Sequence, residues 1–285
     1  MVKKAVIETR MDKIQLETYE KDIEAWRKER EERLRREDSW LTLAGLYWLQ
    51  EGENSIETDP ASNIALPIGS ARDSVGIIDF HDGKAVLRVT GNEPVLVDDA
   101  PTKTAVLRDD AAQAGPSLVK IGAITFFVIK RGDQYGVRVR DANSPERQSF
   151  TGRKWFDINV DYRLRAKFVP HDPVRNISVV NTVGLLTPMD NPGYVEFSLH
   201  GQELRLEAFS EDDGELWFIF KDATSGKSTY GAGRYLIARL ADDDSVDLDF
   251  NKTYNPPCVF TKYATCPLPP NENVLPIAIE AGEKV

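Results

Sequence analysis

Residues 230 to 251 read YGAGRYLIARLADDDSVDLDFN, and this stretch decides how the second half of the chain folds. Apolar and polar residues alternate on both sides of the acidic run 242–245, with the period of two that is typical of β-strands. If that run forms a turn, Leu240 faces Val246 across an antiparallel hairpin. One face of the hairpin is then apolar and predicts a core made by Leu236, Ala238, Leu240, Val246, Leu248 and Phe250.

Arg234 falls on the same inward face, at the end of the strand remote from the turn. The small residues 231–233 leave room around its side chain. A buried guanidinium needs a counter-charge or several acceptors, because an isolated buried charge is costly. Two interpretations stay open, an internal ion pair with an acid such as Asp222 or an anionic ligand held by Arg234.

The next segment, residues 249–270, reads DFNKTYNPPCVFTKYATCPLPP and holds both cysteines and five of the sixteen prolines. Its Pro-Pro and Asn-Pro steps exclude a helix and most sheet pairing, so it is expected to be a long rigid loop of a functional kind. We predict a polar small-ligand pocket here, lined by Tyr230, Arg234, Asn251, Tyr254, Asn255 and Thr265. Asp249 and Asn251 are also expected to anchor the loop through nearby backbone groups.

Cys258 and Cys266 are weak candidates for catalysis. Their spacing of eight fits neither a CxxC redox motif nor a paired zinc-ligand motif. Four interpretations stay open: buried structural thiols, a reactive nucleophile, a disulfide, or metal ligands joined by two of His81, His171 and His200. A nucleophilic thiol needs a base, and His171 is the histidine in an ordered-looking loop. No residues are grouped as metal ligands, so we predict no metal and no other cofactor.

Two helices are expected before residue 51. Residues 13–37 are rich in Glu, Lys and Arg and carry one narrow apolar stripe, which predicts a helix that packs on its own domain. The stripe consists of Leu16, Tyr19, Ile23 and Trp26. Asp38 and Ser39 then offer N-cap oxygens to a second, short and buried helix from Trp40 to Leu49.

After residue 51, short apolar runs are separated by turn residues, the pattern of antiparallel hairpins. The predicted strands of the first half are 64–68, 75–80, 85–89, 94–97, 104–107, 124–130 and 136–140, with His81 at a surface turn. Those of the second half are 162–168, 177–180, 194–199, 203–209, 216–220, 230–240 and 246–250. The basic row Arg163, Arg165 and Lys167 is expected to be solvated or to pair with acidic strands.

The chain is therefore predicted to be mainly β and to have three parts. Residues 1–50 form N-terminal helices packed on the body, and residues 51–150 form a first β-sandwich. Residues 151–285 form a second antiparallel β domain, a sandwich or a barrel, which the Pro-rich loop closes. The boundary between the two β domains is placed between residues 145 and 160.

The formal net charge of −10 argues against nucleic acid and membrane as partners, because both require a basic surface. A small polar or anionic molecule is the expected partner, and a protein is the other candidate. No apolar run approaches the ~20 residues that span a bilayer. The first residues show no leader pattern, so a cytoplasmic location is expected. Common nucleotide-binding and hydrolase motifs are missing, so no reaction class is predicted.

Three segments resemble the family catalogued as domain of unknown function 1684. They are DSWLTLAGLYWLQEGEN (38–54), SGKSTYGAGRYL (225–236) and the run from residue 249 to residue 284 that begins with the Pro-rich loop. The resemblance covers residues 35 to 285 and implies no activity. Residues 95–100 and 117–129 are also similar to forkhead-associated (FHA) sandwiches. Gly69 is followed by Ser70 and not by arginine, so this likeness extends to the fold and not to phosphopeptide recognition.

The leading hypothesis is therefore a cytoplasmic protein with a polar small-ligand pocket in its C-terminal half, and an enzyme of unassigned class acting on a small anionic metabolite is one form of it. In the alternative, the first sandwich is a protein-interaction module and the Pro-rich loop is purely structural.

Overall fold

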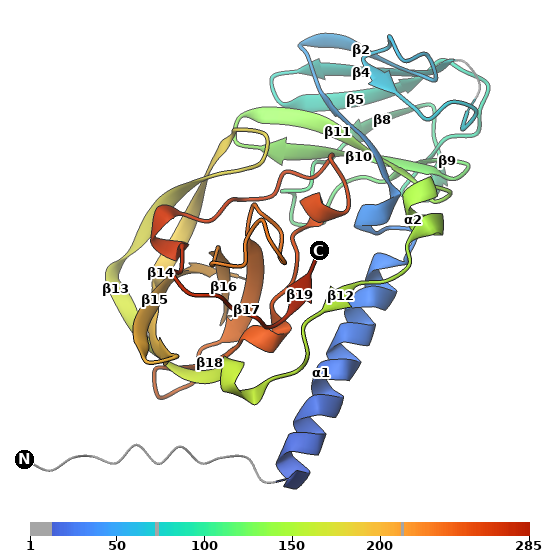
Figure 1. The fold of residues 1–285 in the computed structure, drawn as a ribbon. Helices are drawn as coiled ribbons and strands as arrows, with labels where there is room; N and C mark the ends of the chain where they lie inside the picture. Colours follow the sequence, from blue (N-terminus) through green and yellow to red (C-terminus); the bar gives the residue numbers. More distant parts are fainter. Residues whose placement is uncertain (1–12, 72–73, 212–213) are drawn as a thin grey trace, which may run out of the picture.

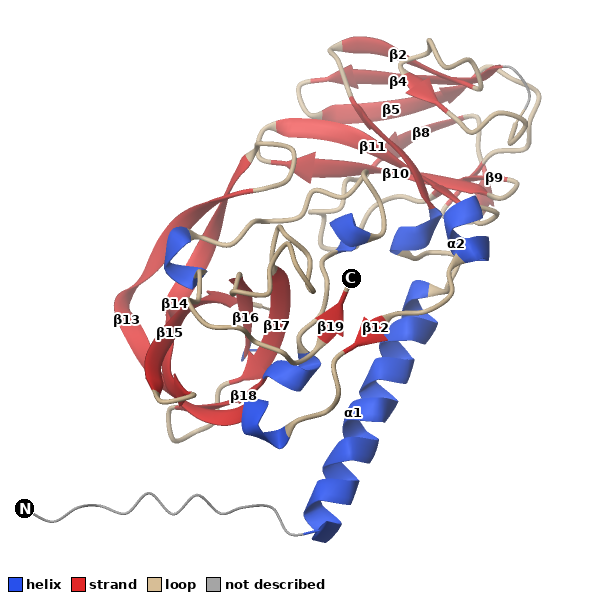
Figure 2. Ribbon diagram, in the orientation of Figure 1, coloured by secondary structure: helices blue, strands red, loops and turns tan. Residues whose placement is uncertain are grey.

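The computed structural model describes residues 13–71, 74–211 and 214–285, and it is mainly β, as predicted. Two β regions lie side by side, and the long helix α1 runs along the second of them (Figure 1). Figure 2 shows how little helix the rest of the chain contains. The helical elements are α1 (Lys13–Leu34), α2 (Pro145–Ser149) and the 3-10 turns η1 (Trp40–Thr42), η2 (Val160–Tyr162), η4 (Phe250–Lys252), η5 (Pro257–Val259) and η6 (Asn271–Asn273). None of the helices within the described residues combines the length and the apolar character needed to cross a membrane.

The first β region consists of two sheets that enclose one apolar core. One sheet has the order β1-β11-β10-β9-β6-β7 and the other the order β3-β2-β4-β5-β8. The strands are β1 (Leu43–Trp48), β2 (Gly52–Glu57), β3 (Ile64–Ala65), β4 (Ser74–His81), β5 (Lys84–Val89), β6 (Leu96–Val97), β7 (Ala100–Pro101), β8 (Thr104–Leu107), β9 (Val119–Ile121), β10 (Ile124–Arg131) and β11 (Gln134–Asp141). Each of the seven predicted strands overlaps one of these, whereas β1, β2, β7 and β9 are not among the predictions.

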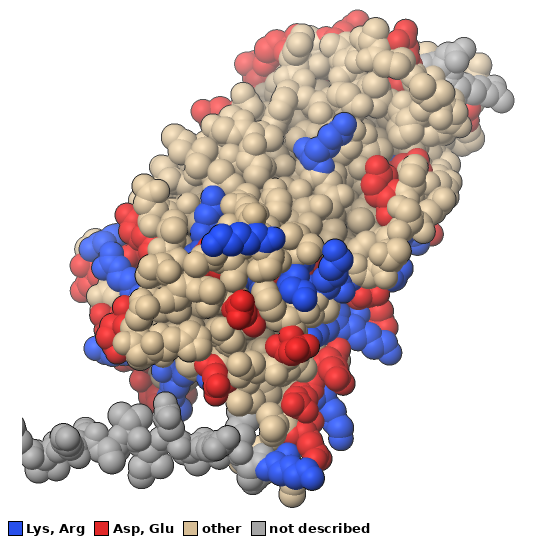
Figure 3. All heavy atoms as spheres, in the orientation of Figure 1, with Lys and Arg blue, Asp and Glu red and all other residues tan. Residues whose placement is uncertain are grey.

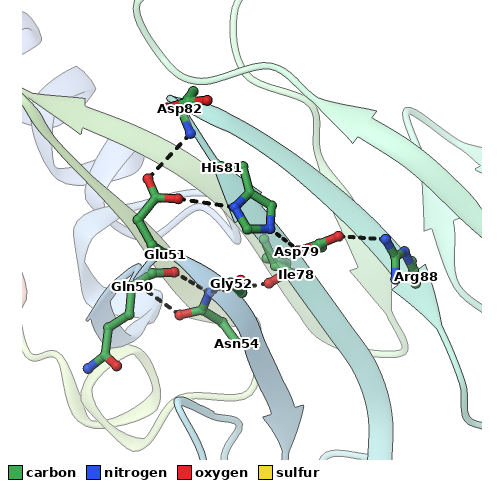
Figure 4. Close-up of polar contacts among 9 residues, drawn as sticks. All are labelled: Gln50, Glu51, Gly52, Asn54, Ile78, Asp79, His81, Asp82 and Arg88. Carbon is green, nitrogen blue, oxygen red and sulfur yellow. Dashed lines mark hydrogen bonds and ion pairs between the residues drawn. The ribbon is translucent and has the colours of Figure 1, made fainter.

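A buried asparagine fixes the corner between β1 and β2 (Figure 4). The Asn54 amide nitrogen donates to the carbonyl oxygens of Gln50, Gly52 and Ile78, and its oxygen accepts the Gln50 N–H at 2.9 Å. His81 lies nearby at the turn between β4 and β5, and its side chain is 63% exposed. This exposure confirms that His81 is a surface residue.

The second β region is one sheet of order β17-β16-β15-β14-β13-β18 that curls into a nearly closed, barrel-like form. Its strands are β13 (Arg163–Val180), β14 (Leu186–Leu199), β15 (Gln202–Ser210), β16 (Glu215–Phe220), β17 (Arg234–Arg239) and β18 (Ser245–Asp249). The edge strands β17 and β18 meet at a bridge between Leu240 and Val246, which confirms the predicted hairpin register. The predicted inward residues of both strands lie in the core of this region.

The basic row on β13 is paired. Arg163 binds Asp247 on the neighbouring strand at 2.6 Å, and Arg165 binds Asp243 in the turn. The interpretation of this row as a partner for an acidic strand is therefore confirmed for Arg163, whereas Arg165 pairs with the turn before that strand.

Helix α1 packs on the second β region through its apolar stripe. Tyr19 and Ile23 are buried, and Leu34 extends the stripe by two turns beyond Trp26. The Tyr19 hydroxyl donates to Asp249 Oδ1 at 2.9 Å, which ties the helix to the end of β18. The predicted first helix and its packing on the same chain are confirmed.

The predicted second helix from Trp40 to Leu49 is wrong. Ser39 does cap a turn, because its hydroxyl oxygen accepts the Leu41 N–H, but that turn is only η1. The chain then enters β1, whose residues pair with β11 in an antiparallel register. The exposed edge of β11 offers backbone partners, while Gly45 weakens a helix and Tyr47 and Trp48 suit a pleated surface. Pairing with a distant strand thus overrides the local apolar pattern.

The C-terminal segment closes the second β region. Leu275, Ile277, Ile279 and Ala281 are buried in its core, and β19 (Glu283–Lys284) pairs with β12 (Lys154–Trp155). The two β regions have separate core clusters. The division into parts 1–50, 51–150 and 151–285 stays a prediction.

Candidate functional site

The Pro-rich loop has the rigid form predicted for it. Between residues 250 and 270 it contains only the short turns η4 and η5, and backbone bridges hold it at two points. Tyr254 exchanges both backbone hydrogen bonds with Tyr235 at 2.9 Å, and Pro267 bridges to Asn181. The loop is therefore fixed against both β17 and the β13–β14 connection.

Arg234 lies where the hairpin parity placed it, and it is fully buried. Its Nη2 donates to Asp222 Oδ2 at 2.9 Å and to the Ile279 carbonyl at 2.8 Å. Its Nη1 donates to the carbonyl oxygens of Ala281 and Glu283. The structure thus has the internal ion pair, and the prediction that Arg234 binds a ligand gains no support from this geometry.

The other predicted ligand-binding residues do not converge on one pocket. Asn251 is buried between α1 and η2, where its amide nitrogen donates to the Tyr19 hydroxyl and to the Asn159 carbonyl oxygen. Asn255 donates its backbone N–H to Glu283 and its side-chain N–H to the Lys284 carbonyl oxygen. Both asparagines anchor the loop.

Three more of the predicted residues lie in different surroundings. Thr265 accepts a hydrogen bond from Arg131 of β10 at 3.1 Å, and Tyr230 lies beside Cys258. Tyr254 contacts the Arg30 guanidinium, which lies 3.7 Å from the centre of the tyrosine ring. Arg30 lines a cavity, so this contact leads from the predicted residues to a candidate site.

A cavity of about 410 Å³ lies at the C-terminal end of α1, and we call it the arginine cavity. Its lining residues are Arg30, Arg33, Leu34, Arg36, Asp38, Ser39, Trp40 and Arg153. Four of these eight residues are arginines and one is an acid, in a chain whose net charge is −10. The local sign of charge is therefore opposite to that of the whole protein.

The Pro-rich loop supplies aromatic support for two of these arginines. Arg30 stacks on Tyr254, and the Arg153 guanidinium lies 4.7 Å from the ring centre of Phe260. Trp26 approaches Arg30 from the helix at 5.2 Å. Aromatic faces attract and orient a guanidinium without neutralising its charge. The loop thus supports two of the cations that line the cavity.

Most arginines of the cavity have acidic partners. Arg153 binds Glu283 at 2.6 Å with both side chains buried, Arg36 binds Asp38 at 3.0 Å, and Arg33 binds Glu29 at 2.7 Å. Among the described residues, Arg30 has neither a hydrogen bond nor an ion pair, and its Nε is buried without an acceptor.

The pKa of Arg30 reflects the burial of its guanidinium without a hydrogen bond or an ion pair. Burial is the first cause that lowers its pKa, to about 10. The charges of Arg153 and Arg33 lower it further, while Tyr254 and the Glu283 carboxylate act in the opposite direction. Arg30 remains a cation at neutral pH, because that value lies far above 7. Arg30 is thus a desolvated cation near Arg153 and Glu283 that is bonded to neither of them among the described residues, and an anion that accepts from its guanidinium would be favoured.

The sequence contains a signal for Arg30 that the stripe prediction missed. Tyr19, Ile23 and Trp26 recur at steps of four and three, and the next positions in this pattern are Arg30 and Leu34. An arginine on the buried stripe is different from the many arginines on the solvated faces of α1. Figure 3 shows acidic and basic side chains interspersed along that helix. Arg27 also turns toward the body, where its Nη2 donates to the Phe156 carbonyl oxygen. Charge density alone therefore does not reveal the inward position of Arg30.

The two cysteines lie next to each other in the loop and are both free thiols. Cys258 donates its backbone N–H to Cys266 Sγ at 3.2 Å. His171 binds Glu207 at 3.2 Å, and within the described residues no contact joins it to either thiol. The described part of the chain contains no group of three or more His, Cys, Asp or Glu residues arranged to hold a metal.

Fold and cavity together define a mainly β protein with an arginine-lined cavity beside its N-terminal helix. The chain belongs to the family described as protein of unknown function DUF1684, whose model matches residues 148–284. An uncharacterized protein of Haloarcula marismortui, solved by NMR, is 32% identical, and the match covers 50% of this chain and 80% of that one with a TM-score of 0.42.

Two FHA-domain structures also match. The FhaA FHA domain, solved in complex with the intracellular domain of another protein, is 19% identical, with coverage of 35% of this chain and 96% of that one and a TM-score of 0.25. An FHA structure from a study of phosphothreonine-dependent interactions is 18% identical, with coverage of 33% and 92% and a TM-score of 0.24. Both matched structures are FHA domains, the same class of fold that residues 95–100 and 117–129 resemble in sequence. No curated protein matches.

Proposed function

We propose that the protein binds a small anionic molecule in the arginine cavity. The observation that carries this proposal is Arg30, a cation that is desolvated, stacked on Tyr254 and without an acidic partner among the described residues. A carboxylate or phosphate group would supply the missing charge and accept from the guanidinium in a planar, two-pronged geometry.

The shape of the site supports a small ligand. About 410 Å³ is within the range of metabolite pockets. The side chains of Arg33 and Arg36 are 69% and 66% exposed, so they lie at the solvent side of the cavity. Arg30 and Arg153 lie deeper, against the Pro-rich loop. An anion would meet the exposed cations first and the less exposed ones afterwards.

Binding is better supported than catalysis. Ser39 is the only hydroxyl among the lining residues of the cavity, and it is occupied as the cap of η1. No lining residue is a histidine or a cysteine. The proposed site lies next to α1 and not in the C-terminal half, since Arg153 is its only lining residue after residue 40. The Pro-rich loop contributes the rings that stack on Arg30 and Arg153. A cytoplasmic location and the exclusion of nucleic acid remain predictions from the sequence.

A protein partner on the first β region is a second candidate. Ile68 and Val106 are 85% and 56% exposed there, which is unusual for large apolar side chains. Ile68 also borders a smaller cavity with Tyr47 and Tyr263. The charged residues that line this cavity, Asp141 and Glu146, are both acidic. Neither is a desolvated charge without a partner of the kind that Arg30 provides, so anion binding ranks first.

Calorimetric titration with a panel of small carboxylates and phosphate esters tests the proposal. We expect at least one anion to bind the parent protein and the Arg30→Gln variant to bind it at least about tenfold more weakly, because a charged hydrogen bond is lost. Arg165→Gln is the matched control, since Arg165 is an exposed arginine paired with Asp243. Equal affinities of Arg30→Gln and Arg165→Gln, or no binding of any anion to the parent, would contradict the proposal.

A further inference from the structure

The thiol pair is a second site, independent of the arginine cavity. Cys258 lies in η5 and is half-buried, whereas Cys266 is only 4% exposed. The Cys258 N–H donates to Cys266 Sγ at 3.2 Å, so the sulfur of one residue lies against the backbone of the other.

Backbone contacts hold both cysteines in place. The Cys266 N–H donates to the Thr182 hydroxyl oxygen at 3.1 Å, and the Thr182 N–H donates to the Cys266 carbonyl oxygen at 2.9 Å. On the other side, Val259 and Phe260 make the turn bonds of η5 to Pro256 and Pro257. The pairing of the thiols is therefore imposed by the fold and does not depend on a flexible tail.

Two tyrosines complete the surroundings of the thiols. Tyr230 lies beside Cys258, and Tyr235 packs in one cluster with Cys266. The hydrogen bond from the Cys266 thiol is the first cause that lowers the pKa of Cys258 to about 7, and the bond from Tyr230 lowers it further. The pKa of Cys266 is raised, first by its bond to Cys258 and then by burial. One sulfur is thus prepared as a thiolate and the other as a thiol.

We propose that Cys258 and Cys266 are a redox pair that a hydroperoxide oxidises to a disulfide. Cys258 gives its proton to water, and its sulfur attacks the peroxide, whose O–O bond breaks. The released alkoxide takes a proton from water and leaves as an alcohol, while Cys258 becomes a sulfenic acid.

Cys266 resolves the sulfenic acid. Its sulfur bonds to the Cys258 sulfur, its proton joins the departing hydroxyl group, and water leaves. In total two thiols lose two electrons and two protons, and the hydroperoxide is reduced to an alcohol and water. The half-exposed Cys258 meets the oxidant, and the buried Cys266 serves as the resolving thiol.

Mass spectrometry of the folded, full-length protein after treatment with equimolar hydrogen peroxide tests the pair. We expect both thiols to disappear together, the mass to fall by two hydrogen atoms, and a dithiol reductant to restore both. In Cys266→Ser, dimedone should label Cys258 as a trapped sulfenic acid. In Cys258→Ser, Cys266 should stay reduced in the folded state. Oxidation of Cys266 in Cys258→Ser at the parental rate would overturn the order of events.

The proposal has a second test that does not depend on a disulfide forming. The pH profile of Cys258 alkylation in the folded protein should have its midpoint near 7 in the parent and a higher midpoint in Tyr230→Phe, which loses the hydroxyl donor. A thermal unfolding scan confirms that each variant is folded. Thiols of the parent that react only after unfolding would overturn the proposal. Anion binding at the arginine cavity should be unchanged in both cysteine variants, so the two proposals can fail separately.

Discussion

Arg30 and Arg234 are two desolvated arginines of one chain in opposite situations. Arg234 donates to Asp222 and to three carbonyl oxygens inside the second β region. Arg30 lies against Tyr254 and Trp26 and has no acceptor among the described residues. Burial of a cation is therefore not in itself the sign of a binding site. Identifying the partner of each N–H group separates a structural arginine from one that is available to a ligand.

The largest difference should be in stability. Arg234→Met should lower the free energy of unfolding by about 3–5 kcal/mol, because Asp222 would stay buried without its cation. Urea unfolding measures this loss. The double variant Arg234→Met with Asp222→Leu should recover part of it, since both charges are then gone. A loss below about 1 kcal/mol in the single variant would mean that the Arg234 bonds contribute no more than an ordinary surface pair.

Arg153 is intermediate between Arg30 and Arg234, because it lines the cavity but has an acidic partner, Glu283. The variant Glu283→Gln removes the charge of that partner. Glu283 neutralises Arg153 and accepts the Asn255 N–H, so its loss should cost about 2–3 kcal/mol of stability. The same change leaves the arginine cavity more positive, and the affinity for the bound anion should rise. Unfolding and titration of the same sample give both numbers. A fall in affinity would show that Glu283 contributes to ligand binding.

A smaller effect is expected in the pH dependence of stability. Burial is the first cause that raises the pKa of Asp249 above its ordinary value of 3.8. The folded state then holds this proton more tightly than the unfolded state, so the contribution of Asp249 to stability falls as pH rises from about 4 through the raised pKa and is level above it. Asp249→Asn should remove this part of the slope. Unfolding at a series of pH values measures it, and an unchanged slope would contradict the assignment.

The smallest stability effect should come from Arg30 itself. Arg30→Met should change the free energy of unfolding by less than about 1 kcal/mol, because the lost stacking is offset by the removal of a desolvated charge. Chemical unfolding without added anion measures this. In the presence of the bound anion, only the parent should gain stability. If Arg30→Met lowered the free energy of unfolding as much as Arg234→Met does, Arg30 would be a structural residue. The proposed difference between the two arginines would then be wrong.

Much of the fold follows from local patterns. The period of two in residues 230–251 fixes which side chains face the core, and it places Leu240 opposite Val246. The helix at residues 13–34 and most hairpins follow in the same way. The exception is the run from Trp40 to Leu49, where pairing with β11 decides the conformation. A strand partner far away in the chain leaves no trace in local periodicity.

The candidate site was less predictable than the fold. Hairpin parity correctly turned Arg234 inward, but it did not show that the carbonyls of Ile279 and Ala281 complete its bonding. The stacking of Arg30 on Tyr254 joins a helix near one end of the chain to a loop near the other. Such contacts depend on how whole elements dock. The local feature that could have predicted the site is Arg30, which continues the apolar stripe of Tyr19, Ile23 and Trp26 on the same helix face.

The hydrogen-bond partners of Arg234 also constrain when the second β region can finish folding during synthesis. Three of its acceptors are carbonyl oxygens from Ile279, Ala281 and Glu283. During synthesis on the ribosome, strand β17 emerges with its arginine long before those residues do. The second β region can therefore reach its final bonding only once residues 279–283 have left the exit tunnel, and until then it holds a cation that is only partly satisfied.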